Sequence, residues 1–188
     1  MLRPDLLHTH MPLQVAGEGN CLFRAISRAQ YGTEDYHELL RLKTALELLT
    51  FSEHYDDTRA DYVDIIDDRC LALPSYCETV ITACTDGAYT ELVHMYVAST
   101  VIGSPIESMH PSSSVHLAAW NKTIVGRAVS AQEVTVHIMW ASSSVSVDSR
   151  HFSANHFVVL HPTANASATV QPTSAATVRQ KRTTELAR

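Results

Sequence analysis

The chain has 188 residues, which is enough for one domain of ordinary size with a buried core. Its 14 basic and 20 acidic residues give a net charge of −6, which argues against a nucleic-acid-binding protein. Because no run of about 18 consecutive apolar residues occurs, we expect no membrane span. The four cysteines form no CxxC pair and are too few for a disulfide scaffold, so we expect reduced thiols in an intracellular protein, cytoplasmic or nuclear.

Composition divides the chain into three parts. Residues 1–12 are predicted to be an N-terminal extension, residues 13–162 a folded domain, and residues 163–188 a flexible tail. Thr, Ala and Ser supply 14 of the 26 tail residues, so the tail cannot bury enough apolar surface to offset the entropy lost on ordering. The tail carries a net charge of +3, which leaves −9 on the rest of the chain.

The first predicted element follows a glycine-rich turn. Gly17-Glu18-Gly19-Asn20 favours a tight turn, and Cys21 then begins a short apolar helix. The free N–H groups and the dipole at a helix N-terminus favour a thiolate, and a glycine-rich turn lets backbone N–H groups face a substrate oxygen. Cys21 is therefore the candidate nucleophile, and it requires a histidine base from elsewhere in the chain.

Four helices are predicted after this segment, over residues 37–51, 59–71, 75–84 and 89–101. In the first of them, leucines recur near helical spacing at Leu39, Leu40, Leu42, Leu46 and Leu49. Pro74 favours the start of the helix over 75–84, and Asp86-Gly87 favours its end.

Three strands are predicted next, over residues 105–109, 134–140 and 156–161, because these runs are short, apolar and rich in β-branched side chains. The order of helices before strands predicts a mixed α/β or α+β domain in which helices pack on a short sheet, and we take α+β as the fold class.

The remaining cysteines and the histidines do not predict a metal site. Cys70, Cys77 and Cys84 are spaced seven apart, too widely for a metal centre, so we expect them to be packed in the core. His151, His156 and His161 are five apart and would alternate between the faces of a strand, so they cannot converge on one ion. We expect no metal and no cofactor.

Several motifs together resemble the ovarian tumour (OTU) family of cysteine proteases. The matching segments are G-E-G-N-C-L-F-R-A-I-S at 17–27, Y-G-T at 31–33, H-x-x-L-R at 37–41, Y-T-E-L at 89–92, G-x-P-I at 103–106 and N-H-F at 155–157. The likeness covers about residues 13–162. The A-N-H-F ending and the Y-T-E-L-V-H-M-Y run are similar to the transposon-associated or vertnin-like OTU group.

The resemblance implies the OTU fold, with a small central β-sheet packed between helical layers. It also implies a thiol-dependent deubiquitinase that hydrolyses the bond after the C-terminal glycine of ubiquitin or a ubiquitin-like modifier. Cys21 matches the family's nucleophile and His156 its general base. The backbone amides of Cys21 and of the preceding Glu18, Gly19 and Asn20 would form the oxyanion hole.

Two positions depart from the family pattern. The family usually has Asp where this chain has Glu18, and many members have Asp or Asn two residues after the histidine, where this chain has Val158. A third residue normally orients the imidazole. The candidates are Asn155, Asp148 and the remote Asp5, or the site works as a dyad. The alternative function is a catalytically inactive OTU-fold module that binds ubiquitin.

An acidic segment has two interpretations. Residues 53–68 hold seven acidic side chains against one arginine, which is typical of a solvated helix face. Because ubiquitin is basic around its C-terminal tail, Asp64, Asp67 and Asp68 are also candidates for contact with the modifier. We expect a monomer whose partners are conjugates of ubiquitin or a ubiquitin-like modifier.

Overall fold

The fold is taken from a computed structural model that describes residues 8–56, 74–110, 120–142 and 154–163. Several predictions concern positions outside these ranges. They are the helix over 59–71, the tail from residue 164 onward, and Asp5, Asp64, Asp67, Asp68, Cys70, Asp148 and His151.

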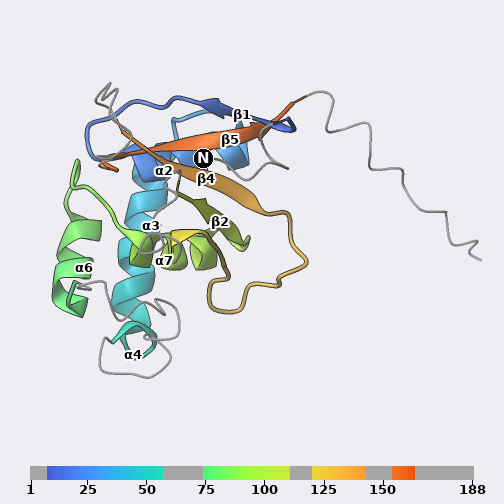
Figure 1. The fold of residues 1–188 in the computed structure, drawn as a ribbon. Helices are drawn as coiled ribbons and strands as arrows, with labels where there is room; N and C mark the ends of the chain where they lie inside the picture. The colour runs from blue at the N-terminus through green and yellow to red at the C-terminus, as the bar shows by residue number, and fades with distance from the viewer. Residues whose placement is uncertain (1–7, 57–73, 111–119, 143–153, 164–188) are drawn as a thin grey trace, which may run out of the picture.

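A mixed sheet of five strands runs through the domain in the order β1-β5-β4-β2-β3 (Figure 1). Its strands are β1 (His10–Leu13), β2 (Ile106–Met109), β3 (Lys122–Ile124), β4 (Val136–Ala141) and β5 (His156–Pro162). The pair β2–β4 is parallel, and the other three pairs are antiparallel. The sheet and the helices together make an α+β domain, as predicted.

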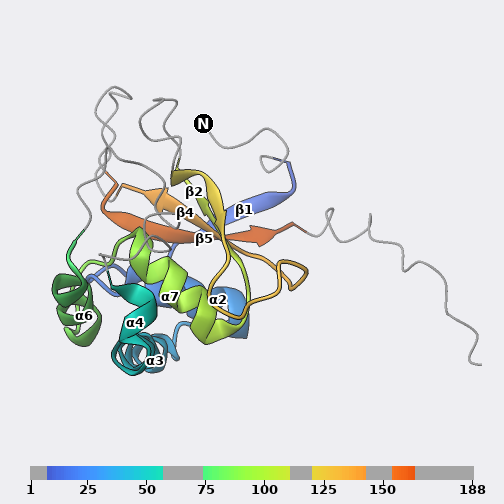
Figure 2. The ribbon, with the colours of Figure 1, turned by 90° about the horizontal axis from the view of Figure 1, so that it is seen from below.

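The described helices lie on one side of the sheet (Figure 2). They are α2 (Cys21–Tyr31), α3 (His37–Thr50), α4 (Ser52–Tyr55), α6 (Tyr76–Cys84) and α7 (Leu92–Ile102). Helices α2 and α7 contact the strands, and α3 packs on α2, α6 and α7 from farther out. The resemblance implied a sheet between helical layers, whereas the described helices cover one face of the sheet (Figure 2). In the ranges the structure describes, none of the helices is both long and apolar enough to cross a membrane.

The predicted elements within these ranges are present, with shifts at their ends. Helix α3 ends one residue before the predicted limit, whereas α7 begins at Leu92 instead of residue 89. Ser75 caps α6: the Glu78 N–H donates to its Oγ over 3.3 Å, and its own N–H donates to Glu78 Oε2 over 2.8 Å. Strands β1 and β3 were not predicted, because both are short, and the predicted boundary at residue 12 falls inside β1.

A cluster of aromatic side chains joins β5 to the rest of the sheet. Phe157 is fully buried, and its ring centroid lies 4.4 Å from that of Trp140 on β4. The Trp140 indole N–H donates to Ser108 Oγ on β2 over 2.8 Å, which satisfies its buried polar atom. This packing holds the start of β5, and therefore His156, in a defined position.

Helix α3 buries a different face from the one its leucines suggest. Of the five leucines near helical spacing only Leu40 is buried, whereas Leu39, Leu42, Leu46 and Leu49 are 47–65% exposed. The residues that α3 buries are Leu40, Arg41, Thr44, Ala45 and Leu48. The neighbouring helices contact α3 along that face. Arg41 is therefore buried, although the leucine spacing predicted that apolar side chains would form the buried face.

The prediction that Cys77 and Cys84 are packed in the core is wrong. Both thiols are exposed, because α6 turns Thr79 and Ala83 toward the neighbouring helices instead. Spacing of seven residues does place two side chains on one helical face, but it does not decide which face is buried.

Candidate active site

The loop before Cys21 has the tight geometry that its glycines predict. Glu18 and Gly19 both adopt left-handed backbone angles, with φ of 61° and 75°. The Asn20 carbonyl accepts the first helical bond of α2 from the Arg24 N–H over 3.0 Å. A Cβ atom on Gly19 would lie 1.7 Å from the carbonyl oxygen of Gly87, so only glycine fits there.

Cys21 begins α2 and is 1% exposed. Burial raises the pKa of its thiol, and this effect outweighs the opposing effects of backbone hydrogen bonds from Phe157, Leu22 and Cys21 itself and of the Arg41 cation. Backbone hydrogen bonds therefore favour the thiolate less strongly than burial favours the thiol.

His156 is the first residue of β5 and is 8% exposed. Burial lowers the pKa of its imidazole, while the Val15 backbone carbonyl and the Glu34 carboxylate raise it. The net effect favours the neutral imidazole, the form that accepts a proton. The Cys21 thiol lies against the backbone of Phe157, the residue that follows His156 along β5, so the start of α2 and the start of β5 meet at this point.

The other predicted site residues lie differently. Asn155 is exposed just before β5, and its N–H donates to the Ala141 carbonyl over 3.1 Å. The Glu18 side chain is 78% exposed and lies 3.8 Å from Arg24, so Glu18 contributes its backbone to the loop, not its carboxylate. Val158, at the position where many OTU members have Asp or Asn, is fully buried.

Sequence reasoning missed the carboxylate that acts on His156. Glu34 accepts the Ala16 N–H at its Oε2 over 3.2 Å and Arg28 Nη1 at its Oε1 over 3.2 Å. The segment that carries the Val15 carbonyl is therefore tied to the C-terminal side of α2. No motif marks Glu34, because its contacts are to a backbone amide and to residues of a neighbouring helix.

Tyr89 completes the surroundings of Cys21. Its ring stacks on Phe157 with centroids 5.6 Å apart and planes 14° apart. Burial raises the pKa of the Tyr89 hydroxyl, and the nearby Cys21 adds to the increase. The sequence singled out Tyr89 only as part of the Y-T-E-L segment, which gave no indication that its ring reaches the site.

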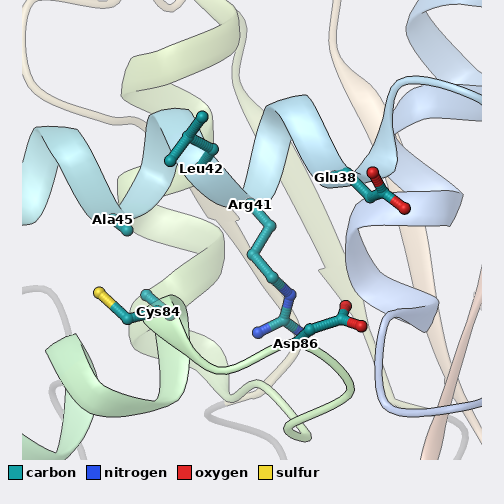
Figure 3. Close-up of a pocket in the computed structure, with 7 residues that line it drawn as sticks. Glu38, Arg41, Leu42, Ala45, Cys84 and Asp86 are labelled. Atoms are coloured by element: carbon teal, nitrogen blue, oxygen red, sulfur yellow. The ribbon is translucent and has the colours of Figure 1, made fainter.

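A separate surface pocket lies between α3 and α6 (Figure 3). It has a volume of about 450 Å³, and Cys21 and His156 are not among the residues that line it. Within the described ranges, no cluster of three or more His, Cys, Asp or Glu side chains is arranged to hold a metal ion.

The family model described as "Vertnin, OTU domain" matches residues 12–141. The vertnins of Ailuropoda melanoleuca and Homo sapiens are 25% and 24% identical to the chain over 160 residues, which is 76% of this chain. The chain spans about a quarter of the length of these relatives, at 23% of each. The family match ends at residue 141, before β5, and so does not include His156. The position of His156 is therefore known from the structure alone.

Solved OTU domains share the fold at low identity. The OTUD1 OTU domain matches with a TM-score of 0.53 and 16% identity, over 81% of this chain and 85% of that one. The OTU protease of Taggert virus matches with a TM-score of 0.56 and 11% identity, over 88% and 86% of the two chains. The ubiquitin-bound OTU of Hazara virus matches with a TM-score of 0.50 and 11% identity, over 85% of both.

Proposed function

The chain belongs to the vertnin OTU domain family, and we propose that it is a thiol-dependent isopeptidase acting on ubiquitin or a ubiquitin-like modifier. One observation carries this proposal: Cys21 is buried at a helix start against the residue that follows a neutral, buried histidine. A nucleophile beside a base that can accept its proton is the minimum that acyl transfer requires.

The reaction begins from a neutral pair. His156 accepts the proton from the Cys21 thiol as the sulfur attacks the carbonyl carbon of the modifier's terminal glycine. Because burial makes both charged forms unfavourable in the empty site, charge separation is favoured only when substrate approaches. The modifier's carbonyl oxygen then carries the negative charge that had been on sulfur.

Backbone amides of the loop stabilise that oxyanion. The N–H of Cys21 lies at the start of α2, where it has no partner within the helix, and the N–H of Asn20 precedes it along the chain. His156 next donates its proton to the leaving lysine amine, which leaves a thioester on Cys21. Water, deprotonated by the same imidazole, hydrolyses the thioester and restores the thiol.

One comparison and one feature of the sequence support ubiquitin as the modifier. The chain has the OTU fold, and the OTU of Hazara virus, which shares this fold, has been solved bound to ubiquitin. The acidic segment that includes Asp64, Asp67 and Asp68 supplies a charge complementary to a basic modifier surface.

The proposal is tested by covalent capture with a ubiquitin probe that carries a C-terminal electrophile. We expect the wild-type chain to form one adduct and Cys21→Ala to form none, while Cys77→Ser, which removes an exposed thiol, reacts like wild type. Cys21→Ala should also abolish hydrolysis of ubiquitin conjugates without changing the melting temperature by more than a few degrees. A folded wild-type chain that binds ubiquitin and forms no adduct would identify the inactive binding module instead.

A further inference from the structure

The Arg41 side chain joins the nucleophile loop to the turn between α6 and α7. It is 5% exposed, on the inner face of α3. All five of its N–H groups are used. Nε donates to Asn20 Oδ1 (2.8 Å), Nη1 to the carbonyls of Thr82 (2.8 Å) and Thr85 (2.7 Å), and Nη2 to the carbonyls of Gly19 (3.1 Å) and Ala88 (2.7 Å).

The bond to the Gly19 carbonyl has a direct consequence for the next amide. In a trans peptide the C=O and the N–H point in opposite directions, so holding the Gly19 oxygen on Arg41 turns the Asn20 N–H away from Arg41. Within the described part of the chain this N–H has no acceptor. The peptide between Gly19 and Asn20 is thus held in one orientation with its donor available.

A second set of contacts holds the same loop. The Asn20 Nδ2 group donates to Asp86 Oδ1 over 2.9 Å, and the Gly19 backbone packs directly on the Gly87 carbonyl. The guanidinium of Arg41 extends toward Asp86 at the edge of the pocket (Figure 3). Arg41 and Asp86 therefore bind Asn20 from both sides of its amide group, and the turn at residues 85–88 supports the loop from outside.

A lysine could not replace this arrangement. The acceptors for Arg41 come from two separate segments, and a planar guanidinium reaches all of them at once, whereas an ammonium has three donors on a single atom. The Arg41 side chain also lies over the Phe23 ring, with Cζ 4.8 Å from the centroid, which orients it toward the loop.

We propose that Arg41 is a positioning residue that holds the Asn20 amide in the orientation required to bind the oxyanion. This inference rests on the proposed function and deepens it. Arg41 does not touch the substrate in this role. It acts through the Gly19–Asn20 peptide, with the Asp86 contact to Asn20 as a second support.

The test compares Arg41→Lys and Asp86→Ala with Arg127→Lys as a matched control. Arg127 also binds through its guanidinium, at 2.7 Å from Glu47 Oε1 and over the Phe51 ring, and neither partner belongs to the loop before Cys21. For hydrolysis of a ubiquitin conjugate, we expect Arg41→Lys to lower kcat about 100-fold with KM changed less than about 3-fold, because a lost oxyanion donor acts on the transition state. Asp86→Ala, at an exposed position, should lower kcat about 3- to 10-fold.

A second readout does not require turnover. The amide order parameter of Asn20, measured by ¹⁵N relaxation, should fall from about 0.85 to below about 0.6 in Arg41→Lys and stay unchanged in Arg127→Lys. This measurement separates the two proposals: if wild type does not hydrolyse ubiquitin but the order parameter falls, the positioning role stands and the proposed function fails.

The proposal is overturned if Arg41→Lys keeps kcat within about 3-fold of Arg127→Lys, or if the Asn20 amide stays rigid. It is also overturned if the loss of kcat only matches a loss of folded protein seen in thermal melts. If Arg41→Lys fails to fold, Asp86→Ala provides the test. An unchanged kcat together with an unchanged order parameter of the Asn20 amide in that variant would refute the positioning role.

Discussion

The two halves of the candidate active site are held in place by different kinds of chemical group. On the nucleophile side, side chains hold the loop: Arg41 and Asp86 bind Asn20, and the loop needs glycine at position 19. On the base side, backbone groups make most of the contacts: His156 faces the Val15 carbonyl, and its strand pairs with β4. Side-chain contacts demand particular residues, whereas any residue supplies a carbonyl, so only one half leaves a strong sequence motif.

The largest effect should come from removing the base. We expect His156→Ala to lower kcat for ubiquitin-conjugate hydrolysis by up to about 10⁴-fold, since the buried Cys21 thiol then has no group to accept its proton. His161→Ala, at the exposed end of the same strand, is the matched control and should change kcat by less than about 2-fold. A loss of less than 10-fold in His156→Ala would show that another group is the base.

The nucleophile loop should be the next most sensitive. Gly19→Ala places a Cβ atom against the Gly87 carbonyl, so the loop must move, and we expect kcat to fall about 100-fold. Gly32→Ala is the matched control, because Gly32 has the same φ of 75° but nothing within 4 Å of the added atom. Gly32→Ala should lose about 1–2 kcal/mol in chemical denaturation, as alanine is strained at this φ, and Gly19→Ala should lose more because its loop must also move. Equal kcat in the two variants would contradict the requirement for close packing at Gly19.

A smaller effect is expected from the carboxylate near the base. Glu34 raises the pKa of His156, so Glu34→Gln should lower that pKa further. The imidazole would then stay neutral to lower pH, and the acid limb of kcat/KM, already below the usual histidine value of about 6.5, should move to more acidic pH. The kcat at pH 7.5 should fall about 3- to 10-fold.

The pH profile distinguishes this role from a loss of structure. Glu38→Gln is a suitable control, because the Glu38 carboxylate is exposed on α3 and does not act on His156. An acid limb that stays in place in Glu34→Gln, or that moves to higher pH, would show that Glu34 does not set the charge of the imidazole.

The smallest effect should come from Asn155, the residue beside the base. Asn155 is exposed and lies just before β5, so Asn155→Ala should keep kcat within about 3-fold of wild type. A loss of 100-fold or more would instead make Asn155 the third catalytic residue and break the contrast between the two halves.

Local patterns predicted much of the fold. Helices α3 and α6 and strands β2, β4 and β5 follow from periodicity, capping signals and short β-branched runs. The same patterns could not decide which face of a helix is buried. Leu42 and Cys84 are exposed while Arg41 is buried, because the buried face depends on which neighbouring helices pack against it. Strand β1 has only four residues and pairs with β5, which lies far away in the sequence, so local patterns did not predict it.

The sequence by itself predicted the α+β class, the OTU family and the candidate nucleophile loop, because these depend on residue types at short spacing: two glycines, an asparagine and a cysteine before an apolar helix. The tertiary structure decided the directions in which the pKa values of Cys21 and His156 shift, and the groups that surround His156. Burial of Cys21, the Val15 carbonyl beside His156 and the Glu34 carboxylate all come from segments that meet only in the folded domain. The pKa of a group depends on everything packed around it, and that packing is not a local property of the sequence.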